Sequence, residues 1–181
     1  MVSSLPGIVG IHHIGVSVPD LAKARAFYIG ILGAIEEVAP MEWSGNPFID
    51  KVVGLQGSAA RQFFCRLGNL QIEVFEYSAP VQAPLQPGRS VNEYGYTHIA
   101  LQVEDVAAVH ERIVAAGLHV HTPPDLSTIT IDADGQKHGY AGTYCRDFFG
   151  NVFEILEIHM SDAIRPIQTI PVQTTGDQSC A

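Results

Sequence analysis

The chain has 181 residues, of which 46% are hydrophobic and 16% are charged. That composition is typical of one compact globular unit and argues against disorder along most of the chain. Its 10 Lys and Arg residues stand against 19 Asp and Glu, a net charge of -9, which disfavours nucleic acid and anionic membranes as partners. No apolar run approaches the ~20 residues that cross a bilayer as a helix.

The first predicted elements are a strand and a helix that follow His13. Alternating apolar residues indicate a strand with one buried face. Asp20 stands where it can cap the next helix, whose apolar residues recur at helical spacing until Gly33, a residue type suited to a left-handed exit. Strand signals then return in three segments, at residues 34–40, 60–68 and 70–77.

The same order of elements begins again at His98. His98 and Asp105 follow His13 and Asp20 at one constant offset, and Gly117 matches Gly33 with a single gap. A match across a whole strand and helix indicates an internal repeat. The second set of strand segments lies at residues 118–124, 140–147 and 151–158. A Gly-Asn turn precedes the last strand of each copy, so the repeated unit is predicted to be βαβββ.

The repeat divides the chain into two modules of one domain, residues 8–160. Module one is predicted to span 8–78 and module two 94–160. Prolines and a lack of periodicity mark residues 79–93 as a linker between them. The tail, 161–181, has no clear periodicity.

The three cysteines and the N-terminal residues indicate the cellular compartment of the protein. Cys65, Cys145 and Cys180 are an odd number without CxxC spacing. The first residues have neither the basic region nor the apolar run of a secretory signal. We therefore expect a reduced, cytoplasmic protein.

Four residues at matched places of the two copies form the candidate site. Strand alternation puts His13 and His98 on the face that points away from the helices. Glu73 and Glu154 lie in the last strand of each copy among apolar neighbours, where a carboxylate is costly unless it is paired or bound to a cation. A single strand histidine is more often a structural residue, but the recurrence of the whole set favours convergence on one divalent metal, Zn, Ni, Co, Fe or Mn. Glu76 and Glu157 fall on the opposite face, as solvated or salt-bridged residues.

Several segments together resemble the vicinal oxygen chelate superfamily. They are residues 13–33, 67–77, 96–105 and 147–157, and the likeness covers about residues 10–160. The superfamily includes glyoxalase I, methylmalonyl-CoA epimerase, extradiol dioxygenases and the bleomycin and fosfomycin resistance proteins. The resemblance implies an α+β fold of two tandem βαβββ modules that form a half-barrel sheet cavity. It also implies a homodimer, and in some members modules from two chains complete each site.

The His-Glu-His-Glu pattern resembles glyoxalase I and the epimerases. It implies a metal-dependent isomerase or lyase that moves a proton next to a metal-bound carbonyl of a small oxygenated substrate, through an enediolate, with Glu154 as the base. Methylmalonyl-CoA epimerases have a further glutamate, and the corresponding place here falls near Gln56 and Gly57. Four arginines could contact a substrate carboxylate singly, but they form no basic cluster for a CoA or glutathione tail: Arg25, Arg61, Arg66 and Arg89.

Two alternatives remain open from the sequence. Residues 138–154 resemble a degraded extradiol signature, which implies ring cleavage with Fe(II) or Mn(II) and makes His138 and Tyr144 further catalytic candidates. Against ring cleavage, Glu73 as a fourth ligand would take a coordination position that a catecholate and O₂ need. The second alternative is a non-catalytic small-molecule binder, but such members generally lack the metal ligands.

Overall fold

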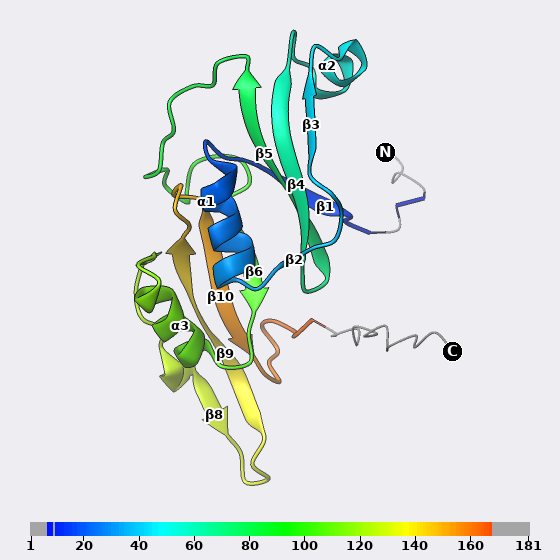
Figure 1. Ribbon diagram of the computed structural model, residues 1–181. Helices are drawn as coiled ribbons and strands as arrows, with labels where there is room; N and C mark the ends of the chain where they lie inside the picture. The colour runs from blue at the N-terminus through cyan, green and yellow to red at the C-terminus, as the bar shows by residue number, and fades with distance from the viewer. Residues whose placement is uncertain (1–6, 9, 168–181) are drawn as a thin grey trace, which may run out of the picture.

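The structure, a computed structural model, describes residues 7, 8 and 10–167 and consists of two five-stranded mixed sheets with few helices (Figure 1). The first sheet has the order β1-β5-β4-β2, with β3 paired to β4, and the second has the order β6-β10-β9-β7, with β8 paired to β9. Equivalent strands therefore occupy equivalent places, and the predicted α+β fold is confirmed. Of the predicted tail, residues 168–181 lie outside the described residues. No described helix is long and apolar enough to span a membrane.

The first module contains five strands and three helical segments. They are β1 (His13–Ser17), α1 (Leu21–Arg25), the π-helix η1 (Ala26–Ile31), β2 (Ile35–Glu36), β3 (Met41–Ser44), α2 (Pro47–Val53), β4 (Ala59–Leu67) and β5 (Leu70–Ala79). The second module repeats this plan without a counterpart of α2. Its elements are β6 (His98–Gln102), α3 (Val106–Ala115), β7 (His119–Val120), the 3₁₀-helix η2 (Leu126–Thr128), β8 (Ile129–Ile131), β9 (Lys137–Arg146) and β10 (Val152–Ile158).

Strands β3 and β8 and helix α2 were not predicted. Helix α2 has clear local causes, because the Asn46 side chain accepts hydrogen bonds from two backbone N–H groups of its first turn and Pro47 opens the helix. Gly54 ends it with a φ of 70°, which glycine adopts without strain. The predicted βαβββ unit is thus correct for the elements that the two modules share. It omits β3, β8 and α2.

Each predicted N-cap is confirmed, and a second carboxylate reinforces it. Asp20 accepts a hydrogen bond from the N–H of Lys23, and Asp105 accepts one from the N–H of Ala108. The first backbone N–H of each helix also donates to a glutamate of the last strand. These bonds run from Leu21 to Glu76 at 2.7 Å and from Val106 to Glu157 at 3.0 Å. Glu76 and Glu157 also form ion pairs with Arg61 and Lys137, which confirms that they are salt-bridged on the helix side of the sheets.

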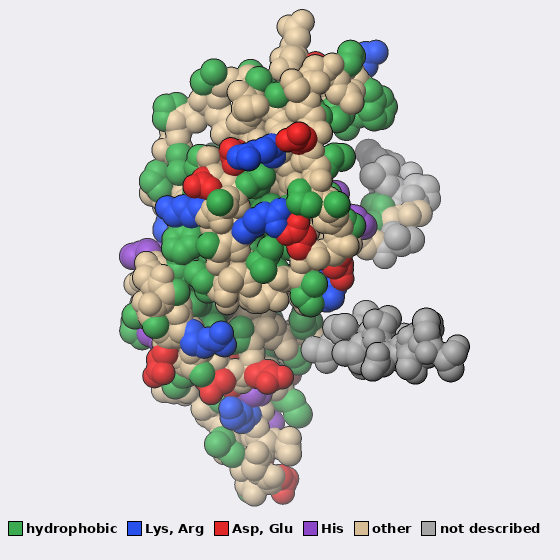
Figure 2. All heavy atoms as spheres, in the orientation of Figure 1, with side chains coloured by type: hydrophobic (Ala, Val, Ile, Leu, Met, Phe, Trp, Pro, Cys, Tyr) green, Lys and Arg blue, Asp and Glu red, His purple; other side chains and the backbone are tan. Residues whose placement is uncertain are grey.

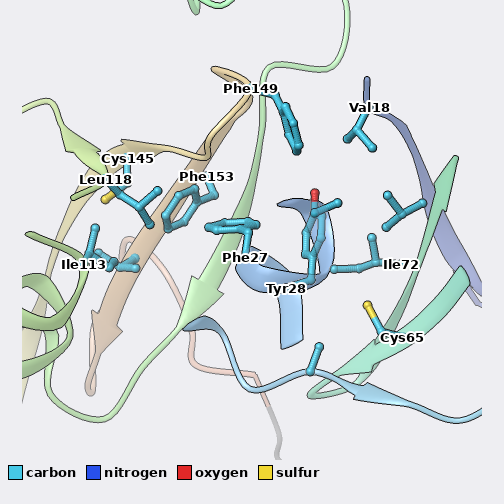
Figure 3. Close-up of a cluster of buried hydrophobic side chains, with 14 of the residues drawn as sticks. Val18, Phe27, Tyr28, Cys65, Ile72, Ile113, Leu118, Cys145, Phe149 and Phe153 are labelled. Atoms are coloured by element: carbon cyan, nitrogen blue, oxygen red, sulfur yellow. The ribbon is translucent and has the colours of Figure 1, made fainter. Parts of the chain in front are cut away.

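One continuous core joins the two modules, and the α1–η1 segment lies in its middle. Figure 3 shows Phe27 and Tyr28 between side chains of the two sheets. On the first sheet these include Ile72 and Cys65, and on the second Phe153, whose ring centroid is 5.2 Å from that of Phe27. Both sheets therefore turn their helix-side faces inward. Their other faces, which carry the candidate site residues, point away from this shared core.

Candidate metal half-sites

The first half-site is a histidine–glutamate pair on the outward face of the first sheet. Strands β1 and β5 are parallel neighbours, and Glu73 is in register with Gly15, two residues beyond His13. That stagger brings Nε2 of His13 to 3.2 Å from Oε2 of Glu73. The histidine side chain is 39% exposed and the glutamate 15%, so the pair opens to solvent on its histidine side.

The second half-site repeats this geometry on the outward face of the second sheet. Glu154 of β10 is in register with Ala100, two residues beyond His98 of β6. Nε2 of His98 lies 3.4 Å from Oε2 of Glu154. The same strand pair, the same stagger and nearly the same distance therefore recur in both modules.

Burial and hydrogen bonding act in opposite directions on Glu73. Desolvation raises the pKa of its carboxyl, while His13 and a hydrogen bond from Gln62 lower it, and the net change is upward. Gln62 is itself buried, in the middle of β4. Sequence reasoning missed this residue, although an amide among the apolar residues of a predicted strand, on the same face as the candidate ligands, was a usable signal.

Tyr144 extends the second half-site across the sheet. It lies opposite Glu154 in the β9–β10 pairing, and its ring centroid is 4.6 Å from that of His98. His121 directly follows β7, and its backbone N–H donates to the Tyr144 carbonyl, while its ring centroid is 6.0 Å from that of Tyr144. Glu154, Tyr144 and His121 thus form a row on one face. No spacing in the sequence marked His121 as part of the site.

The other candidate, His138, lies elsewhere. Its Nε2 is 2.7 Å from Oδ2 of Asp132, in the connection between β8 and β9. Asp132 also accepts backbone hydrogen bonds from Asp134 and Gln136, so the pair belongs to that turn. His138 joins neither histidine–glutamate pair.

Both pairs suit a divalent cation in donor type and spacing. Two ligand atoms about 2.1 Å from a metal and at right angles around it are about 3 Å apart, close to both N–O distances. Within residues 7, 8 and 10–167, however, no three His, Cys, Asp or Glu side chains gather at one point. The expected convergence of all four ligands therefore does not occur within one chain, because the shared core separates the two faces. One chain carries two half-sites.

The four arginines considered as substrate contacts are all engaged with carboxylates. Arg25 pairs with Glu36, Arg61 with Glu76, Arg66 with Glu37 and Arg89 with Glu93. Figure 2 shows blue and red side chains next to one another on the visible face, without a large basic patch. These four arginines therefore give no ready-made site for a polyphosphate tail.

The two described cysteines are unreactive because their thiols are buried. Cys65 and Cys145 are buried in the core and are not in a disulfide. Burial raises the pKa of each thiol to about 11, which keeps both protonated at neutral pH. The third, Cys180, lies outside the described residues.

A protein of two such modules with paired His and Glu on the sheet faces is a vicinal oxygen chelate protein. The model of the Glyoxalase/Bleomycin resistance protein/Dioxygenase superfamily matches residues 10–155. The chain belongs to this superfamily, and the resemblance of its segments is confirmed.

Epimerases are among its relatives. The 2-epi-5-epi-valiolone epimerase of Actinomyces sp. is 31% identical over 85% of this chain and 82% of its own length. The mitochondrial methylmalonyl-CoA epimerase of Mus musculus is 28% identical over 54% of this chain, which spans about half of that relative. These relatives indicate an enzyme of the epimerase or isomerase kind.

Solved structures support the fold. A glyoxalase family protein from Bacillus cereus superposes with a TM-score of 0.70 at 17% identity, over 88% of this chain and 99% of that one. The fosfomycin resistance protein of Listeria monocytogenes, in complex with Mn(II) and sulfate, has a TM-score of 0.50 at 26% identity, over 83% and 93%. The second protein is a relative crystallised with a divalent metal.

Proposed function

We propose that this protein is a divalent-metal-dependent epimerase that removes and returns a proton at a carbon next to a carbonyl. The observation that carries the proposal is the pair of equivalent half-sites, His13 with Glu73 and His98 with Glu154, at 3.2 and 3.4 Å. Packing alone does not require the same two residue types at the same stagger on both outward faces. Together they supply two imidazoles and two carboxylates, a donor set suited to Mn, Fe, Co, Ni or Zn.

Glu154 is the base in this proposal. A bound cation would supply positive charge beside the substrate carbonyl oxygen and so favour loss of the neighbouring proton. The Glu154 carboxylate takes that proton, and the C–H electron pair moves toward the carbonyl oxygen. A solvent water then donates a proton to the opposite face of the carbon, which inverts it, and Glu154 releases its own proton to solvent. Tyr144, beside both His98 and Glu154, can donate a hydrogen bond from its hydroxyl to hold the substrate.

A valiolone-type ketone is a better candidate substrate than a CoA thioester. The relative named for valiolone covers most of this chain, whereas the methylmalonyl-CoA epimerases match only about half of it. Arg25, Arg61 and Arg66 are paired with glutamates and would have to break those ion pairs to hold phosphates. A small uncharged ketone requires no such cluster, because hydroxyl groups can bond to side chains such as Tyr144 and His121.

The test is proton exchange in D₂O. With Mn(II) present, 2-epi-5-epi-valiolone should gain deuterium next to its carbonyl and change configuration, as followed by NMR, whereas methylmalonyl-CoA should not. Glu154→Gln should lower the rate by ~10²-fold or more, since a positioned base contributes 10²–10⁴-fold. Glu42→Gln, an exposed carboxylate of β3, is the matched control and should leave the rate unchanged.

Oxygen chemistry would give a different result. Consumption of O₂ with a catechol would contradict the epimerase proposal and favour ring cleavage. Binding of the ketone without any deuterium exchange would instead favour a non-catalytic binder.

A further inference from the structure

Three aromatic side chains lie on the outward face of the first sheet, beside its half-site. Phe75 and Tyr77 follow Glu73 at alternate places of β5 and therefore share its face. Trp43 of β3 reaches the same face, because it is in register with Ala60 of β4, which is in register with Tyr77. Trp43, Phe75 and Tyr77 are called the aromatic wall.

The rings of the aromatic wall pack into one surface. The ring centroids of Phe75 and Tyr77 are 5.6 Å apart in a stacked arrangement. Trp43 stands edge-on to both, with centroid distances of 6.1 Å to Phe75 and 5.8 Å to Tyr77. All three residues are half-buried, so each keeps some contact with solvent. Partly exposed rings beside a candidate site offer an apolar contact surface to a ligand.

Tyr77 connects the aromatic wall to the half-site. Burial raises the pKa of Tyr77, and the nearby charge of Glu73 raises it further. The hydroxyl is therefore protonated at neutral pH and can donate a hydrogen bond. On β1, Gly15 is in register with Glu73, and a Cβ there would lie 3.7 Å from the Phe75 ring. The glycine leaves the space between His13 and the aromatic wall without a β1 side chain.

Helix α2 holds Trp43 in its orientation. The indole Nε1–H donates to Oγ of Ser58 at 3.0 Å, and the Ser58 hydroxyl donates to Oδ1 of Asp50 in α2 at 2.5 Å. Asp50 also accepts hydrogen bonds from the backbone N–H groups of Gly57 and Ser58. Ser58 is fully buried, so these hydrogen bonds lie inside the protein and reinforce one another. The polar edge of Trp43 is thus satisfied within the chain, and its apolar faces are left for other contacts.

The aromatic wall and its support break the symmetry of the repeat. On β10, the places two and four residues beyond Glu154 carry Leu156 and Ile158, which are not aromatic. Helix α2 has no counterpart in module two (Figure 1). The histidine–glutamate pairs occur in both modules, whereas the aromatic wall occurs in one. A metal ligand set can be symmetric but a substrate is not, so residues that recognise the substrate are expected where the modules differ.

We infer that the aromatic wall binds the C–H face of a ring-shaped substrate and so selects cyclic polyhydroxy ketones over open-chain ones. The C–H groups of a saturated ring pack against the electron-rich faces of aromatic side chains, while Tyr77 can bond to a ring hydroxyl. Asp50 and Ser58 are positioning residues, because they act on the substrate only through Trp43. The inference rests on the proposed epimerase function and identifies the part of that site that recognises the ring.

Fluorescence gives a direct test, because Trp43 is the only tryptophan of the chain. Addition of 2-epi-5-epi-valiolone to the protein with Mn(II) should cause a saturable change in tryptophan emission. Dihydroxyacetone, an open-chain hydroxyketone, should cause no saturable change at the same concentrations. An equal response to both ketones would contradict selection for a ring.

The kinetics of deuterium exchange give the second test. Trp43→Ala should raise KM for 2-epi-5-epi-valiolone about 10-fold and leave kcat within about twofold, since the aromatic wall contacts the ring equally before and during proton transfer. Trp43→Phe keeps an aromatic ring and should recover most of the loss. Phe48→Ala, at an exposed residue of α2, is the matched control and should leave KM unchanged.

Asp50→Asn tests the positioning role. This change keeps the size of the side chain but weakens its bonds to Ser58. The tryptophan emission of the free protein should therefore shift, and KM should rise about threefold without a change in kcat. An unchanged emission together with an unchanged KM would contradict the role of Asp50.

The outcomes separate the two proposals. Normal deuterium exchange, with no effect of Trp43→Ala on KM, would overturn ring recognition by the aromatic wall and leave the epimerase proposal intact. A saturable emission change in the wild type without any deuterium exchange would support ring binding at the aromatic wall and contradict the epimerase proposal.

Discussion

The last strand of each module carries two glutamates that point to opposite faces of the sheet and have different roles. Glu73 and Glu154 point outward to the half-sites, whereas Glu76 and Glu157, three residues later, point to the helices. An odd separation on a strand always changes the face. One strand can therefore hold a candidate metal ligand on one face and, three residues later, a helix-capping carboxylate on the other.

The first prediction concerns the capping role of Glu157. This carboxylate is buried and accepts bonds from the Val106 N–H, Lys137 and His159. Glu157→Gln keeps the size but loses the charge and some of these bonds, so the free energy of unfolding should fall by about 1–3 kcal/mol. Urea denaturation checks this, with exposed Glu104→Gln expected to stay within about 0.5 kcal/mol of wild type.

The second prediction is the pH dependence of that effect. Burial tends to raise the pKa of Glu157, but its bonds with Val106, His159 and Lys137 outweigh burial, and the net pKa lies below its ordinary value of 4.5. A carboxyl with a lowered pKa in the folded state stabilises the fold above its unfolded pKa and loses that contribution as pH falls through the folded value. The stability difference between wild type and Glu157→Gln should therefore be constant near pH 7 and shrink below about pH 4.5. A difference that grows in acid would contradict this.

At the scale of elements, the β9–β10 pairing holds the base of the proposed reaction. Gly142 lies opposite Leu156 in that pairing, and a Cβ at this place would come within 2.8 Å of the Ile155 carbonyl oxygen and 3.4 Å of Oε1 of Glu154. Close approach of the two strands beside Glu154 thus depends on the absence of a side chain.

The third prediction tests this close contact. Gly142→Ala should force β9 away from β10, lower the free energy of unfolding by about 1–3 kcal/mol and weaken Mn(II) binding. Gly30→Ala is the matched control, since its Cβ would meet open space in the π-helix η1. There the substitution should be neutral or stabilising by up to about 1 kcal/mol. Differential scanning calorimetry and Mn(II) dialysis measure the two effects.

For the whole molecule, the shared core makes the two modules one folding unit. The Phe27 ring lies between the sheets and contacts Tyr28, Phe148 and Phe153. Module two therefore buries part of η1, the helix of module one that contains Phe27. A chain with this arrangement should unfold in a single transition, because neither module keeps its core without the other.

The fourth prediction is the effect of Phe27→Ala. Removal of this buried ring should lower the free energy of unfolding by about 3–5 kcal/mol. Guanidinium denaturation followed by fluorescence and by circular dichroism should give coincident curves for the wild type. Phe48→Ala, at a residue that is 74% exposed, should change stability by less than about 1 kcal/mol. Two separate transitions in the wild type would contradict the shared core.

Local physics made much of this protein predictable. The N-caps Asp20 and Asp105, the Gly33 and Gly117 helix exits and the outward direction of His13 depend on neighbours within a few residues, and each is visible in the sequence. The unpredicted α2 was also locally encoded, by Asn46, Pro47 and Gly54, but its signals lay outside the repeat. His121 was not locally encoded, because only the pairing of β7 beside β9 brings it to Tyr144.

The sequence by itself determined the repeat, the order of the main elements along each copy and the sheet face on which each candidate histidine lies. Alternation along a strand and a constant stagger between neighbours are short-range properties, and two copies of the same pattern reinforce one another. Only the tertiary structure decided that the two pairs lie apart. That outcome depends on which apolar faces bury each other, here Phe27 against Phe153, and no local pattern specifies how two similar modules share a core.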